Sequence, residues 1–167
     1  MSSEEKEQGG PDLKPVIRLL GWLTVCYAVC FVGYLGSSDL WFWYIALRRP
    51  AWAPPFWMVT PVWMVVYGIA AAASWQIWIA PPRRDRTVGL VLFAIQLALA
   101  GLWPWGLYHF HSFRLSMAIS TNLWPVAFVA TVVFGRVRPS AAYLMIPWLL
   151  WTALLAVLEF VLWRMNS

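Results

Sequence analysis

The sequence predicts an all-α integral membrane protein, a bundle of five transmembrane helices. Of its 167 residues, 62% are hydrophobic and 11% are charged, whereas soluble domains are about half apolar and about a quarter charged. The charges are clustered and leave five uncharged runs, each long enough for the roughly 20 helical residues that cross a bilayer. These runs lack the alternating polar residues of a β-barrel, so in lipid they must satisfy their backbone hydrogen bonds as helices.

One helix is expected in each uncharged run. The predicted ranges are 17–35, 61–80, 88–107, 115–134 and 142–163. The first run starts too late and is too long for a cleavable signal peptide, and no small-residue cleavage site follows it, so we expect a retained helix. Residues 1–15, with four charged side chains near the start and a Gly-Gly-Pro break, are expected to be a short disordered tail. Residues 16–167 should form one five-helix membrane domain.

The connections between the predicted helices differ in length. Those after the second, third and fourth helices are short, which favours antiparallel packing of consecutive helices. The first connection, residues 36–60, is long, rich in Pro and aromatic side chains, and too apolar for a solvated linker. Because long ordered loops are often functional, we expect this one to fold onto the mouth of the bundle.

The twelve Lys and Arg residues lie mainly in the connections at helix ends and form no continuous basic face, which argues against a nucleic-acid partner. They indicate topology instead. With the N-terminus inside, the inner side carries eight of them and the outer side four, as expected for cytoplasmic connections. We therefore expect a multi-pass protein with a cytoplasmic N-terminus. Because no cleavable or mitochondrial targeting segment is found, a prokaryotic inner membrane is favoured.

Few residues carry catalytic or metal-binding chemistry. The sequence has no Gly-rich phosphate loop and no cluster of metal ligands, so no metal and no bound cofactor are expected. Cys26 and Cys30 lie one helical turn apart, where a disulfide is geometrically awkward and two thiols alone make a poor metal site, so free thiols are expected. His109 and His111 could be haem or metal ligands, but their spacing near a helix end points them apart and favours a polar loop role.

Glu159 is the only acidic residue within a predicted span. A carboxylate in a membrane helix is costly and usually faces the bundle interior, a partner or water. Its position about one turn from the helix end equally allows it to extend to the membrane surface or to pair with Arg164. The sequence leaves both interpretations open.

The chain contains fourteen tryptophans. An interfacial belt accounts for those near predicted helix ends, since indole prefers the headgroup region: Trp22, Trp41, Trp78 and Trp163. Others stand beside or close to prolines, and the Trp103-Pro104-Trp105 and Trp124-Pro125 motifs are expected to interrupt regular helix. Rigid aromatic walls of this kind can enclose a flat apolar ligand, with ordinary helix packing as the alternative.

Three groups of residues resemble the signature of one membrane protein family. The first is Trp43-Tyr44 with Pro50-Ala51-Trp52-Ala53-Pro54-Pro55 and Pro61-Val62-Trp63-Met64-Val65-Val66-Tyr67. The second is Gln96-Leu97-Ala98-Leu99 with Leu102-Trp103-Pro104, and the third is Ile146-Pro147-Trp148-Leu149-Leu150-Trp151 with Trp163-Arg164-Met165-Asn166. In this order and spacing, over residues 41–166, the chain resembles the TspO/MBR family, the tryptophan-rich sensory proteins related to the mitochondrial translocator protein.

The resemblance implies a homodimer of five-helix bundles and a pocket beneath the first loop. Its ligands would be porphyrins such as protoporphyrin IX or haem, sterols, or benzodiazepine-type compounds, and the protein would be a membrane receptor, sensor or carrier. Trp52 and Pro55 would shape the loop. The implied ligand-binding residues are Tyr44, Pro54, Trp63, Trp103, Pro147 and Trp151.

Two further functions are weighed against this one. The first is a light-dependent enzyme that degrades porphyrin, in which the resemblance implies Trp63 and Trp151 as the reacting indoles. The second is a conventional transporter, for which the spans lack ion-coupling residues.

The chain also departs from the family pattern. Ala100 stands where Asn follows Gln-Leu-x-Leu, Trp148 where Tyr follows Pro, and Glu159 where Asn follows Leu. The lost amide and the added carboxyl are expected to shift ligand preference. Phe160 replaces the Tyr of the cholesterol-recognition pattern, which argues against sterol binding through that motif.

Overall fold

A computed structural model of the chain describes residues 13–37 and 40–167, without the side chains of residues 40–42 and 56. All regular structure in this part is helical, and five helices are long and apolar enough to cross a membrane. The predicted fold class is therefore confirmed. The expected tail lies mostly outside the described residues, as does the side chain of Trp41. The long helices are α1 (Lys14–Leu35), α3 (Phe56–Trp78), α4 (Arg84–Pro104), α5 (Phe113–Val137) and α6 (Pro139–Asn166).

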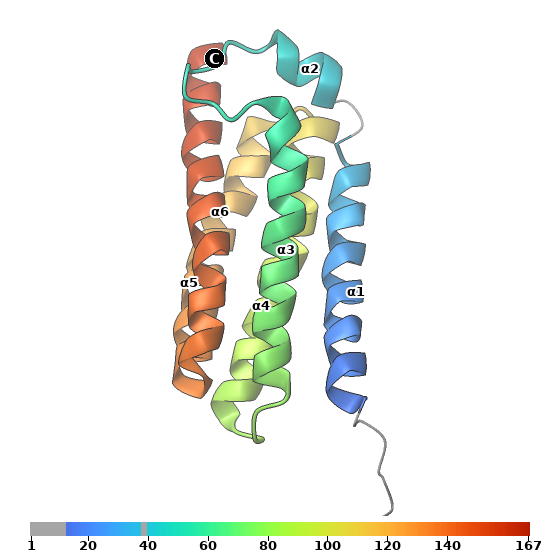
Figure 1. The fold of residues 1–167 in the computed structure, drawn as a ribbon. Coiled ribbons are helices and arrows are strands. Elements are labelled where there is room, and N and C mark those ends of the chain that lie inside the picture. The colour runs from blue at the N-terminus through green and yellow to red at the C-terminus, as the bar shows by residue number, and fades with distance from the viewer. Residues whose placement is uncertain (1–12, 38–39) are drawn as a thin grey trace, which may run out of the picture.

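The five long helices form a closed ring. The order around the bundle is α1, α3, α6, α5, α4 and back to α1, with further contacts between α3 and α4. Consecutive helices from α4 to α6 are close neighbours as expected, whereas α3 packs more extensively on α1 and α6 than on α4. Helix α1 begins at one end of the bundle and the chain ends at the other, where the short helix α2 (Leu40–Ala46) lies across the bundle end (Figure 1).

Prolines lie inside three long helices without ending them, namely Pro61 in α3, Pro125 in α5 and Pro147 in α6. The prediction that Trp124-Pro125 interrupts regular helix is therefore wrong, and α3 begins before Pro61, its predicted start. A proline removes one backbone donor and clashes with the preceding turn. Transmembrane helices tolerate this because neighbouring helices, hydroxyl side chains and local adjustments satisfy the freed carbonyls.

Helix α4 ends in a different way. Pro104 is its last residue, and a π-helical turn, η1 (Trp105–His109), follows it. The Phe110 N–H donates to the Trp105 carbonyl at 2.9 Å, which is the i to i+5 bond of a π-turn. The prediction that Trp103-Pro104-Trp105 interrupts regular helix is thus confirmed. Helix α5 then starts with Ser112 as its cap, because the Ser112 hydroxyl accepts from the Leu115 N–H at 3.3 Å.

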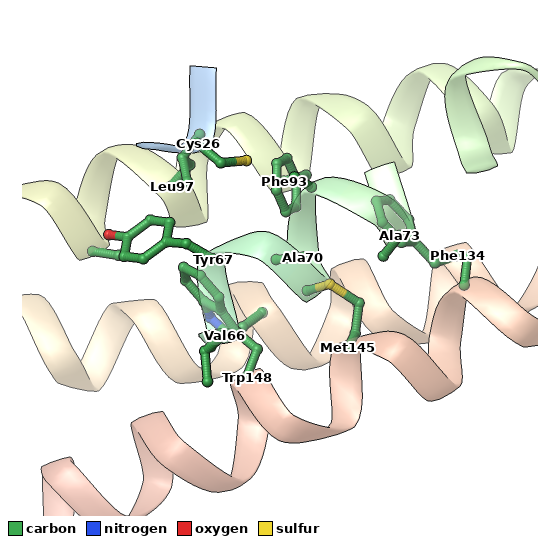
Figure 2. Packing of buried hydrophobic residues seen from close by; sticks show 14 of the residues in the cluster. Cys26, Val66, Tyr67, Ala70, Ala73, Phe93, Leu97, Phe134, Met145 and Trp148 are labelled. Carbon is green, nitrogen blue, oxygen red and sulfur yellow. The ribbon is translucent and has the colours of Figure 1, made fainter. Parts of the chain in front are cut away.

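The half of the bundle away from α2 is closely packed. Figure 2 shows part of its core, to which Cys26 of α1, Ala70 and Ala73 of α3, Phe93 of α4 and Met145 of α6 contribute. Alanines and glycines let membrane helices approach closely, so that dispersion contacts stabilise the bundle where lipid removes most of the hydrophobic driving force. We call this part, together with the α3–α4 and α5–α6 turns, the closed half.

The connection between α1 and α3 packs onto the other end of the bundle, as its apolar composition predicts. The Trp43 ring lies 5.0 Å from that of His111 and 5.4 Å from that of Phe113. Near the end of α6, the Arg48 N–H donates to Asn166 Oδ1 at 2.9 Å, and Asn166 Nδ2 donates to the Arg48 carbonyl at 3.0 Å. The connection is therefore held on both sides, and we call this part of the molecule the loop half. Helix α2 was not predicted.

Candidate functional site

A cavity of about 370 Å³ lies in the loop half, between α1, α3 and α4. Its walls are predominantly apolar. Three of its lining residues, Tyr34, Leu35 and Thr60, are exposed, so the cavity reaches the outer surface of the bundle between α1 and α3. Its size falls within the roughly 300–1,000 Å³ of small-molecule sites. The remaining walls are Cys30, Gly33 and Ser37 on the α1 side, Val59, Trp63 and Tyr67 of α3, and Ala100, Trp103, Pro104 and Tyr108 of α4 and η1.

Trp63 joins the cavity to a cluster of aromatic rings behind it. Its ring lies 5.4 Å from Tyr67, 5.8 Å from Trp148 and 6.3 Å from Trp151. The two tryptophan contacts are edge to face, the arrangement that aromatic quadrupoles favour. Trp148 is fully buried. The Trp63 face of the cavity is therefore supported by a second layer of indoles from α6.

The π-turn brings Tyr108 to the cavity next to Trp103. Five residues of regular α-helix would place these two side chains about 140° apart around the axis. The wider turn at η1 brings them together, with ring centroids 5.7 Å apart and nearly perpendicular planes. Both side chains are buried. The irregular end of α4 therefore builds one wall of the cavity.

Glu159 lies behind this wall, inside the bundle. It is 1% exposed, and its Oε2 accepts hydrogen bonds from Trp103 Nε1 at 3.1 Å and from Ser120 Oγ at 2.8 Å. Of the two interpretations that the sequence left open, the structure shows the interior one. Glu159 does not line the 370 Å³ cavity but a space of about 10 Å³ on the far side of Trp103.

Tyr44 of α2 covers that smaller space from the loop. Its side chain is 3% exposed and its ring meets the Tyr108 ring edge-on at 6.1 Å. The Arg49 guanidinium lies 5.4 Å above the Tyr44 ring. Burial raises the pKa of the Tyr44 phenol above its usual range, and the neighbouring Arg49 charge opposes that shift. The phenol is therefore a neutral part of the roof in the physiological range.

The structure brings some of the predicted ligand-binding residues to the cavity and leaves others apart from it. Trp63 and Trp103 line it, and Trp151 contacts Trp63 from behind. Tyr44 lines the neighbouring space with Glu159. Pro54 lies half-buried in the loop and Pro147 half-buried inside α6, and neither belongs to the described walls of the 370 Å³ cavity. Contact of any of them with a ligand stays a prediction.

Several wall residues were not predicted from the sequence. Cys30 and Gly33 share the inward face of α1 with Cys26, and their i, i+4, i+7 spacing is the signal that could have identified this face. Tyr108 has no such signal, because its position depends on the π-turn. Both cysteines are free, as expected.

The two histidines do not form a ligand pair. Both are exposed, and they contact different tryptophans, since the His109 ring lies 5.1 Å from Trp105 and the His111 ring 5.0 Å from Trp43. Among residues 13–37 and 40–167, no group of three or more His, Cys, Asp or Glu side chains could hold a metal ion.

Comparisons with known proteins agree with this architecture. The model of the TspO/MBR family matches residues 22–164. The translocator protein of Homo sapiens is 31% identical over 158 residues, which cover 91% of this chain and 92% of that protein. The translocator protein of Sus scrofa is 32% identical over 127 residues, 75% of each chain. The tryptophan-rich protein TspO of Chlorobaculum tepidum is 29% identical over 154 residues, 86% of this chain and 95% of that protein.

Proposed function

This chain belongs to the TspO/MBR family, and from that premise we propose that it is a membrane receptor, sensor or carrier for flat hydrophobic molecules, in particular tetrapyrroles such as protoporphyrin IX or haem. The observation that carries the proposal is the 370 Å³ cavity, whose walls include Trp63, Tyr67, Trp103 and Tyr108. Flat aromatic faces provide large contact area for a planar ring at low entropic cost.

The composition of the cavity favours binding over acid–base chemistry. The polar side-chain groups of its lining residues are hydroxyls, one thiol and the N–H groups of two indoles, and Ala100 contributes a methyl group where the family pattern has an amide. The carboxyl group of Glu159 is screened from the cavity by Trp103. Such walls offer an apolar ligand contact area and few directional hydrogen bonds, so sterols and benzodiazepine-type compounds are secondary candidates for the same cavity.

A ligand screen tests the proposal. The purified protein in lipid nanodiscs is titrated with protoporphyrin IX, haem, a sterol and a benzodiazepine-type compound, with tryptophan fluorescence as the readout. A receptor or carrier gives saturable quenching with one tetrapyrrole site, and mass spectrometry recovers the ligand unchanged. Quenching that does not saturate for either tetrapyrrole would contradict the proposal.

A light-dependent porphyrin-degrading enzyme is the alternative. The observation that favours it is the contact between Trp63, which lines the cavity, and Trp151 directly behind it. The same titrations are repeated under illumination. Loss of porphyrin with time in light but not in darkness, abolished by Trp63→Phe, would establish the enzyme.

The expected homodimer is a separate proposal. Chemical cross-linking in native membranes, followed by mass measurement of the complex in nanodiscs, distinguishes a dimer from a monomer. A monomer under both conditions would contradict it.

A further inference from the structure

Trp103 separates three spaces in the loop half. One face of the residue lines the 370 Å³ cavity. The residue also lines a space of about 10 Å³ shared with Trp63, Ser120 and Leu155, and another of about 10 Å³ shared with Tyr44 and Glu159. Close packing normally holds a buried indole in place. Here the residue borders three unfilled spaces, so packing alone does not fully fix the Trp103 ring.

A hydrogen bond supplies the missing constraint. The Trp103 indole has one donor, Nε1, and its acceptor is Glu159 Oε2 at 3.1 Å. The same oxygen accepts from Ser120 Oγ at 2.8 Å, which fixes the carboxyl group from α5 while Glu159 itself belongs to α6. Trp103 belongs to α4. The position of the cavity wall therefore depends on a carboxyl group that is anchored by two other helices.

We propose that Glu159 is the positioning residue of the ligand cavity, which fixes the Trp103 indole as a rigid wall and so presets the cavity for a flat ligand. This inference rests on the proposed function. Preorganisation increases affinity because the bound geometry need not be selected from several at the cost of entropy. Without that bond the indole could tilt within the unfilled volume beside it, and the cavity would lose its defined width.

A double-mutant cycle tests whether Glu159 acts through Trp103. Protoporphyrin IX affinity is measured for wild type, Glu159→Leu, Trp103→Phe and the double variant in nanodiscs. Glu159→Leu removes the acceptor, and Kd should rise about tenfold, which corresponds to 1.4 kcal/mol. Phenylalanine has no N–H, so in the Trp103→Phe background the Glu159→Leu change should alter Kd less than about twofold, since coupled residues are not additive.

A matched control separates this effect from the general cost of changing a buried polar residue. Gln96 of α4 is fully buried, does not line the cavity, and neither of its side-chain amide atoms has a hydrogen-bond partner in the described part of the chain. Gln96→Leu makes nearly the same change in size and polarity as Glu159→Leu. The Kd of Gln96→Leu for protoporphyrin IX should stay within about twofold of the wild-type value.

The indole proton gives a readout that does not depend on any ligand. In ¹⁵N-tryptophan-labelled protein, the Trp103 Nε1–H resonance is identified by its absence in Trp103→Phe. Glu159→Gln keeps an oxygen acceptor of the same length but changes the strength of the bond, because a carboxyl oxygen and an amide oxygen differ as acceptors. That resonance should shift in Glu159→Gln, and this variant should retain most of the affinity that Glu159→Leu loses.

The outcomes decide between the two proposals. If wild type binds no tetrapyrrole, the proposed function fails. The resonance of Trp103 then still tests whether Glu159 holds the Trp103 indole. If wild type binds and the Kd change from Glu159→Leu is the same in both backgrounds, the positioning role is wrong while the proposed function stands. If Glu159→Leu does not fold, an unshifted Trp103 resonance in Glu159→Gln overturns the positioning role, and a shifted resonance with most of the affinity retained supports it.

Discussion

The two halves of this bundle differ in the side chains that fill the space between the helices. In the closed half, alanines of α3 pack in one core cluster with Phe93, Phe134 and Met145. In the loop half, large aromatic side chains replace the alanines, α4 ends in a π-turn, and a 370 Å³ cavity remains. Under the proposed function, the closed half supplies stability and the loop half provides the binding cavity.

Two buried polar side chains, one in each half, differ in what they bond to. The buried carboxyl group, Glu159, lies in the loop half and is bonded to side chains of two other helices. In the closed half the Ser74 hydroxyl bonds only to the Ala70 carbonyl of its own helix. Bonds between helices fix relative positions, whereas bonds within a helix do not. The Glu159 carboxyl group is therefore suited to defining the geometry of a site.

The largest expected effect comes from the same substitution made in both halves. Ala73→Leu adds side-chain volume to the closed half at a fully buried position, and overpacking should lower the free energy of unfolding by about 1–3 kcal/mol. Ala100→Leu adds the same volume where the side chain lines the cavity, so it should cost little stability and block ligand binding. Denaturant titrations and ligand titrations of both variants measure this.

Equal loss of stability in the two variants, with tetrapyrrole binding intact in Ala100→Leu, would remove the distinction between the halves.

A smaller effect is expected within the loop half from the indole that faces the cavity. Trp63→Phe removes part of the aromatic wall and should weaken tetrapyrrole binding by about 1 kcal/mol, a several-fold change in Kd. Trp124 of α5 is 39% exposed, stacks on Phe128 and does not line the 370 Å³ cavity, so Trp124→Phe is the matched control and should leave the tetrapyrrole Kd unchanged. The prediction fails if both variants bind like wild type.

The sequence predicts the spans because charged residues are excluded from them, which is a strong and local signal. It predicts the helix ends poorly, because Arg84 and Asp85 lie in the first turn of α4 and Arg136 in the last turn of α5. Charged side chains are tolerated there, beyond the apolar run. The short helix α2 lies in a Pro-rich stretch without periodicity, so nothing in the local pattern distinguishes it from loop.

The site could be predicted only in part. Trp63 and Trp103 were predicted by the family resemblance, which identifies motifs along the chain. The inward direction of the Glu159 side chain could not be predicted from the sequence. It depends on Trp103 and Ser120, which lie 56 and 39 residues away in the chain. The π-turn that places Tyr108 is a local deviation with no sequence rule of its own. Long-range packing and backbone irregularity account for the residues that were missed.

The attachment of the loop to α6 should have a weaker effect. Asn166→Ala removes both hydrogen bonds to the Arg48 backbone. Because Asn166 is exposed, the free energy of unfolding should fall by only about 0.5 kcal/mol. Hydrogen exchange of the amides of residues 47–55 should become faster, while those of the closed half are unaffected. Ser167→Ala is the control, since that hydroxyl bonds to its own helix. Unchanged exchange over residues 47–55 would show that the attachment does not hold the loop.

A further prediction concerns the orientation of the chain in the membrane, which affects neither stability nor affinity. If the N-terminus is cytoplasmic, the closed half faces the cytoplasm and the loop half faces the other side of the membrane. The turns of the closed half and the helix ends beside them carry Arg83, Arg84, Arg136 and Arg138, as expected for cytoplasmic connections. A reporter fused after Ser167 should be active on the non-cytoplasmic side. A cytoplasmic signal from that reporter would reverse the orientation of both halves.

The native cysteines test the central claim, ligand binding in the loop-half cavity, most directly. Cys30 is half-buried and lines the cavity, whereas Cys26 is fully buried in the core, and the chain has no other cysteine. A small methanethiosulfonate reagent should modify Cys30, and a Cys30→Ser variant should not react. Protoporphyrin IX should slow the modification of Cys30 in proportion to the fraction of sites it occupies, with the greatest protection at saturation. An unchanged rate at saturation would place the ligand elsewhere and contradict the account.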